Sequence, residues 1–148
     1  MLPPMFAILL AACAPAPAPA PKPPPDPVTE DWYAPATAQL ATMNRQAEVL
    51  LREGKSDRAA AVITSAQSWA GRLLAAPDPT LGAMEAASDL DQMYAAMLLG
   101  NQNYGWARLF FQKNVSRWKN WRPQTVETAR RLKLAQDGIA ECDRRMGQ

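Results

Sequence analysis

Residues 47–70 read AEVLLREGKSDRAAAVITSAQSWA, and this stretch decides the fold. Apolar side chains recur at intervals of three or four residues on both sides of Gly54, which is the spacing of amphipathic helices. Glycine often follows the last turn of a helix because it adopts left-handed backbone angles without strain. Ser56 comes soon after it, and serine is a favoured residue at the start of a helix. The stretch therefore predicts two helices that pack side by side across a short turn at Gly54.

Six positions of this hairpin follow the order small, large, glycine, small, large, small: Ala47, Leu50, Gly54, Ala59, Ile63 and Ala66. The order resembles the tetratricopeptide repeat, a helical hairpin in which alanine lets two helices approach closely. The chain departs from that family after the hairpin, since Gly100 lies 46 residues beyond Gly54 where one repeat length would be about 34. No proline stands where the repeat would end, and Gly105 occupies an alanine position. We therefore expect either repeat-like helical hairpins or a plain five-helix bundle.

The chain after residue 35 lacks the alternating apolar pattern of a strand, and good helix formers dominate it. Turn signals divide it into five helices, expected at about residues 36–52, 56–75, 80–100, 101–122 and 124–146. The short connections favour antiparallel neighbours. The predicted fold class is therefore all-α, with one helical domain over residues 35–148. In the last helix the expected core stripe consists of Val126, Ala129, Leu132, Ala135, Ile139, Cys142 and Met146.

An apolar segment, MLPPMFAILLAA, occupies residues 1–12. It is shorter than the roughly 20 residues that a membrane-spanning helix needs, and it fits the apolar part of a signal peptide. No Lys or Arg precedes the apolar run, whereas signal peptides usually start with positive charge. The alternative is a short apolar tail that ends in an incidental cysteine.

Residues 10–13 read LAAC and resemble the lipobox of bacterial lipoproteins. That resemblance implies cleavage after Ala12 and attachment of lipid to Cys13. Ala14, in place of aspartate, implies sorting to the outer membrane. Since two or more acyl chains hold a protein stably at a membrane, the expected location is the cell envelope, lipid-anchored and facing the periplasm.

A proline-rich segment follows the cysteine, with 8 prolines among residues 13–27. Proline has no amide N–H and its φ angle is fixed, so this segment can form neither a helix nor a sheet. We expect residues 13–34 to be a disordered, extended tether that rises about 3.1 Å per residue. The alternative is a ligand for a proline-binding module, or a strap through the cell wall.

The fourth expected helix reads NYGWARLFFQKNVSRWKNWRP, residues 103–123, and combines aromatic rings with cations. On a helical wheel, one stripe is apolar and is assigned to the core: Tyr104, Ala107, Phe111, Val115 and Trp118. A second stripe holds the candidate partner-binding residues Trp106, Phe110, Lys113, Arg117 and Trp121. Three interpretations stay open for this stripe: packing beneath the third or fifth helix, contact with a protein partner, or contact with anionic lipid headgroups.

Charge is unevenly distributed, although the whole chain carries a net charge of only +2. Residues 26–100 contain 5 basic and 10 acidic side chains, whereas residues 101–148 contain 10 basic and 4 acidic ones. This contrast favours self-association or an acidic partner. Nucleic acids also bind basic aromatic surfaces. An exported lipoprotein would rarely meet them, so we expect no nucleic-acid partner.

The chain contains no histidine, no Cys-x-x-Cys pair and no glycine-rich phosphate loop. We therefore expect no catalytic residue, no metal ligand and no cofactor. Glu85 and Asp89 share one helix face, but such pairs are usually solvated surface. Cys142 falls on the apolar stripe of the last helix and is expected to be buried.

Taken as a sequence, the chain is predicted to be an outer-membrane lipoprotein whose helical domain is a non-catalytic adaptor or scaffold for another envelope protein. The alternative is a structural lipoprotein that binds anionic membrane or cell-wall surfaces through its basic aromatic helix. The prediction leaves the oligomeric state open.

Overall fold

The computed structural model describes residues 23–147 of the 148-residue chain. Within these residues the chain forms five α-helices, one short 3-10 helix and no strand, so the predicted all-α fold class is confirmed. The elements are η1 Pro27–Thr29, α1 Tyr33–Arg52, α2 Ser56–Leu74, α3 Leu81–Gly100, α4 Tyr104–Asn120 and α5 Val126–Met146. The predicted signal peptide at residues 1–12, the lipid site Cys13 and the tether up to residue 22 lie outside the described residues.

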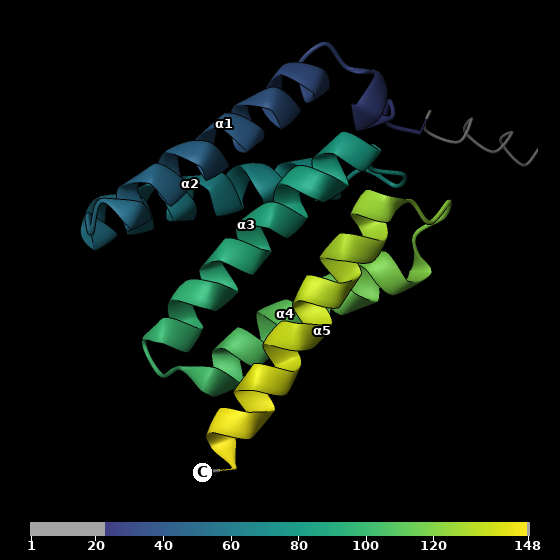
Figure 1. The fold of residues 1–148 in the computed structure, drawn as a ribbon. Coiled ribbons are helices and arrows are strands. Elements are labelled where there is room, and N and C mark those ends of the chain that lie inside the picture. Colours follow the sequence, from purple (N-terminus) through teal and green to yellow (C-terminus); the bar gives the residue numbers. More distant parts are fainter. Residues whose placement is uncertain (1–22, 148) are drawn as a thin grey trace, which may run out of the picture.

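The helices form two antiparallel pairs on either side of α3, as Figure 1 shows. One pair is α1 with α2, and the other is α4 with α5. α3 contacts all four other α-helices, which makes it the centre of the fold. α3 must therefore be apolar around much of its circumference, and its sequence, LGAMEAASDLDQMYAAMLLG, has that composition. None of the helices in residues 23–147 combines the length and the apolar character needed to cross a membrane.

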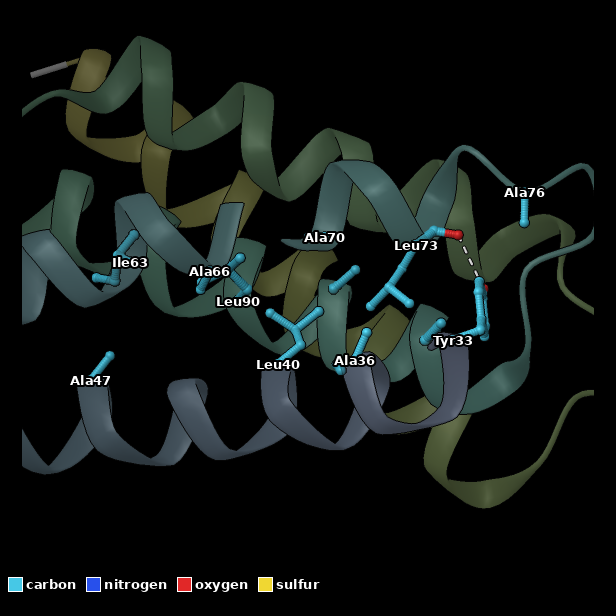
Figure 2. Packing of buried hydrophobic residues seen from close by; sticks show 13 residues of the cluster. Tyr33, Ala36, Leu40, Ala47, Ile63, Ala66, Ala70, Leu73, Ala76 and Leu90 are labelled. Carbon is cyan, nitrogen blue, oxygen red and sulfur yellow. Dashed lines mark hydrogen bonds between the residues drawn. The ribbon is translucent and has the colours of Figure 1, made fainter. Parts of the chain in front are cut away.

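The hairpin predicted around Gly54 is present. Gly54 has a φ angle of +70°, which is the left-handed conformation expected of a glycine that ends a helix. Ala47 of α1 and Ile63 of α2 are at most 1% exposed (Figure 2). Ala59 of α2 is also fully buried, so the small residues do allow close packing of the two helices. The helical hairpin is therefore confirmed, while membership of the tetratricopeptide family stays a prediction.

The folded region starts earlier than predicted. The ring of Tyr33 is 1% exposed and its hydroxyl donates to the Leu73 carbonyl at 3.0 Å (Figure 2). Val28 and Trp32 also pack against this core, so residues 27–34 belong to the helical domain and not to the tether. Pro35 does not prevent α1 from starting at Tyr33, because the first amides of a helix have no carbonyl partner within it.

A second core lies between α3, α4 and α5, around Ala95, Ala107, Phe111 and Cys142, which are at most 2% exposed. Cys142 is thus buried, as expected. Three core expectations for α4 are met by Ala107, Phe111 and Trp118, which are at most 2% exposed. Tyr104 and Val115 are only partly buried, and Asn114 is buried instead of Val115 at 1% exposure. Asn114 can be buried because its side-chain amide donates a hydrogen bond to the Ser88 carbonyl of α3.

The apolar stripe expected along α5 is wrong at both ends. Val126 is 85% exposed and Met146 is 48% exposed, although Ala135 and Cys142 between them are fully buried. At the start of α5, Thr128 is buried instead, because Thr125 and Thr128 form a reciprocal capping box. α5 packs mainly against α4, so the side chains of α5 that point away from α4 remain exposed.

Gly138 lets α4 and α5 pack closely. A Cβ atom added at Gly138 would lie 2.6 Å from Cε1 of Phe111, which is shorter than real contacts allow. The ring of Phe111 is 2% exposed and has little room to move aside. The face of this ring therefore requires glycine opposite it.

We expect Gly138→Ala to lower the free energy of unfolding by about 1–3 kcal/mol, because overpacking displaces the Phe111 ring. The matched control is Gly71→Ala in α2, where an added Cβ has no atom within 4 Å. That control should be neutral or stabilise by about 0.5–1 kcal/mol, since alanine favours a helix over glycine. Urea unfolding followed by circular dichroism measures both, and equal effects of the two substitutions would contradict the packing argument.

Candidate functional site

A buried polar network joins α3 to α4. The indole Nε1 of Trp118 donates to Ser88 Oγ at 2.7 Å, and the amide of Asn114 donates to the Ser88 carbonyl at 2.9 Å. Arg117 donates to Oδ1 of Asn114 and, through its second terminal nitrogen, to Oδ2 of Asp91 at 3.1 Å. The side chains of Arg117 and Asp91 are each 6% exposed. Because each buried polar side chain has a partner, the network stabilises one relative position of the two helices.

Lys113 extends this network towards the surface. Its Nζ atom lies 3.1 Å from the carboxylate of Asp91, while 54% of the Lys113 side chain remains exposed. The same Nζ atom lies 5.6 Å from the centroid of the Phe110 ring. Phe110 in turn packs edge-on against Tyr94 of α3, with ring centroids 4.8 Å apart. Two of the predicted cations, Lys113 and Arg117, are therefore held by one carboxylate of α3.

A second ion cluster connects α3 to α5. Arg131 lies 3.0 Å from both Glu85 and Asp89, and 3.5 Å from Glu127. Partial burial opposes the charge of Arg131, but hydrogen bonding to Asp89 and the surrounding carboxylates raise the pKa of its guanidinium above the ordinary value. The two carboxylates that share a face of α3 thus act as partners of an arginine.

Much of the charge contrast in the sequence is neutralised within the fold. In residues 101–147, eight basic side chains lie within 4.0 Å of a carboxylate: Arg108, Lys113, Arg117, Arg130, Arg131, Lys133, Arg144 and Arg145. Three of the carboxylates, on Glu85, Asp89 and Asp91, come from the acidic half of the chain. The acidic and basic halves of the chain therefore meet along α3. The surface formed by residues 101–147 is thus less basic than the sequence of these residues indicates.

Two neighbouring hollows lie between α2 and α4, with α3 as their floor. They have volumes of about 340 and 520 Å³ and share Gln67 and Phe110. We call the two hollows together the aromatic groove. Its remaining lining residues are Ala70, Gly71 and Leu74 of α2, Ala87, Leu90, Asp91, Tyr94 and Leu98 of α3, Asn103, and Trp106 and Lys113 of α4.

The five predicted partner-binding residues occupy different surroundings. Trp106 is 64% exposed at one end of the aromatic groove, and Phe110 is partly buried within the groove. Lys113 lies at the opposite end of the groove. Arg117 is buried in the polar network, and Trp121 packs against Trp118 at a centroid distance of 6.1 Å, outside the groove. The structure therefore brings three of the five together, in a groove whose α2 and α3 walls sequence reasoning did not identify.

Another groove, of about 580 Å³, lies between α1, α3 and α5. Six of its ten lining residues are polar or charged, among them Asn44, Glu48, Asp89, Gln92 and Arg130. Asn44 donates to the Ala86 carbonyl at 2.7 Å. Charges of both signs line this groove, and none of its lining side chains is aromatic.

The described residues contain no group of three or more His, Cys, Asp and Glu side chains that could hold a metal ion. Cys142 is fully buried, and burial raises the pKa of its thiol. A buried thiol with a raised pKa is a poor nucleophile, so the aromatic groove is the better candidate site.

The chain was compared with known protein families, with curated proteins and with solved structures, and none of them matches. Its function is therefore inferred from its own residues.

Arg117→Met should lower the free energy of unfolding by about 3 kcal/mol, because it leaves the carboxylate of Asp91 buried with only Lys113 beside it. Lys133→Met is the matched control, since Lys133 pairs with Asp137 on the surface and its side chain is 73% exposed. The control should change the free energy of unfolding by less than about 1 kcal/mol. Adding Asp91→Leu to Arg117→Met should recover part of the loss. Urea unfolding measures all three, and similar losses for Arg117→Met and Lys133→Met would count against a buried pair.

Proposed function

We propose that this protein is a lipoprotein of the bacterial envelope, anchored through Cys13, and that its helical domain is a non-catalytic adaptor. The aromatic groove between α2 and α4 is the proposed binding site for another envelope protein. The observation that carries this proposal is Trp106, a tryptophan that is 64% exposed beside a concave apolar surface. Tryptophan is enriched among the residues that contribute most to protein–protein binding.

Neighbouring side chains support a protein partner. Leu109 is 57% exposed on the same helix as Trp106, so α4 presents two large apolar side chains to solvent. Gln67 and Asn103 supply amide groups at the groove, which can pair with polar groups of a ligand. An apolar centre with a few polar groups at its edge is the usual anatomy of a protein interface.

Ion pairing argues against the alternative of binding to anionic membrane or cell-wall surfaces. Within residues 101–147 only Lys119 and Arg122 have no carboxylate within 4.0 Å. Arg122 donates instead to the carbonyls of Lys119 and Trp121, at 3.1 and 2.8 Å. Attraction to an anionic surface grows by about 1 kcal/mol per nearby cation, so paired cations add little.

Cys13→Ser should move the protein from the membrane fraction to the soluble fraction, because the thiol that would carry the lipid is gone. Immunoblotting of fractionated cells measures the shift. Intact mass spectrometry of the wild-type protein should find Cys13 as the first residue, carrying acyl chains. An unmodified residue 1 in the wild-type protein, or unchanged fractionation of the variant, would contradict the anchor.

Trp106→Ala should abolish cross-linking to the partner when a photoreactive amino acid is placed at position 109 of the envelope-anchored protein. Trp121→Ala is the matched control, because it removes the same side chain from the C-terminal end of α4 but leaves the aromatic groove unchanged. A discrete cross-linked product should persist in that control.

Thermal unfolding of both variants establishes that loss of the product does not reflect loss of the fold. The proposal fails if no product forms, or if Trp106→Ala and Trp121→Ala reduce it equally.

A further inference from the structure

We propose that residues 14–22 of this chain bind in the aromatic groove when no partner occupies it. The tether would then be an intramolecular ligand that a partner has to displace. This inference concerns the same groove as the proposed function but does not depend on the identity of any partner.

The chemistry of the segment fits the groove. Residues 14–22 read APAPAPAPK, which has no acidic residue and one cation at its end. Proline-rich segments favour the polyproline II conformation, and such segments bind grooves lined by aromatic side chains with little loss of conformational entropy. Tyr94, Trp106 and Phe110 line one part of the groove, and the small residues Ala70, Gly71 and Ala87 leave space in the other.

The chain enters the domain beside one end of the groove. Trp32 stacks on Arg72 of α2, with the guanidinium carbon 5.0 Å from the ring centroid. The neighbours of Arg72 in the same helical turn, Gly71 and Leu74, line the groove. Val28 and Tyr33 pack at this same end of the domain, where α2 ends and α3 begins. A segment that precedes residue 23 therefore starts from the end of the domain at which Leu74 and Ala87 line the groove.

The length of the segment also fits. The floor of the groove runs along α3 from Ala87 to Leu98, which is about 16 Å at the helical rise per residue. Residues 14–22 span about 28 Å in the polyproline II conformation. The segment can therefore run the length of the floor, and Cys13 would lie at the far end, near Trp106.

The position of Cys13 distinguishes a tether that is bound in the groove from one that is free. The helices alternate in direction, so α4 starts at the end of the domain far from residue 23 and ends near it (Figure 1). Trp106 is in the first turn of α4, and Trp121 directly follows α4. A free tether would bring Cys13 closer to Trp121 on average, whereas a bound tether would hold it close to Trp106.

The test uses the full chain in its unlipidated form, with a nitroxide spin label on Cys13. The only other cysteine is Cys142, which is fully buried and has a raised thiol pKa, so labelling is selective in the folded protein. NMR spectra then report the loss of intensity at each tryptophan indole N–H. We expect the Trp106 signal to lose most of its intensity, and the Trp121 signal to lose little, independently of protein concentration.

A control chain replaces four prolines of the segment, as Pro15→Ser, Pro17→Ser, Pro19→Ser and Pro21→Ser. It keeps the length and the label but lacks the stiff conformation, so the Trp106 signal should recover. Equal broadening of Trp106 and Trp121 would overturn the proposal, as would broadening of Trp106 that persists in the control chain. Broadening that increases with concentration would assign the groove to the tether of a second copy and would also overturn it. A negative result here leaves the cross-linking test of the proposed function unaffected.

Discussion

The ion pair between Asp91 and Arg117 is the interaction on which the arrangement of this domain depends. It places two charges in the interface between α3 and α4, where neither can be removed without leaving the other buried. Asn114, Ser88 and Trp118 complete the hydrogen bonds around it, so the two helices are held in one register. That register determines how far α4 stands from α2, and hence the width of the aromatic groove.

The central helix α3 supplies a floor to both grooves because its two faces have different composition. Asp89, Gln92 and Met93 face the groove beside α1 and α5, whereas Leu90, Tyr94 and Leu98 face the groove beside α2 and α4. The two sets of residues alternate along the same turns of α3, and the helical spacing places them on different faces. α3 has a neighbouring helix on every side, but the two helix pairs do not cover it completely. Part of each of its two faces therefore remains exposed in a groove.

The helices and the turn at Gly54 could be predicted from the sequence, because periodic apolar residues and a left-handed glycine act locally. The burial of Arg117 could not be predicted from the sequence, because its partner Asp91 lies on another helix. The spacing of residues within α4 indicates only which face of the helix Arg117 occupies. Trp106 and Phe110 share one stripe of the sequence and line the same hollow, but the contribution of Gln67 and Leu98 to the groove depends on tertiary packing. The start of α1 was missed because the prolines outweighed Tyr33, whose burial is visible only once α2 lies beside it.

The way the chain enters the domain has a mechanical consequence. Tension applied to residue 23 reaches the helices at Trp32 and Tyr33, where one ring stacks on Arg72 and the other is hydrogen-bonded to Leu73. Both contacts join the start of α1 to the last turn of α2, so a pull on residue 23 strains these two contacts before it reaches the rest of α1.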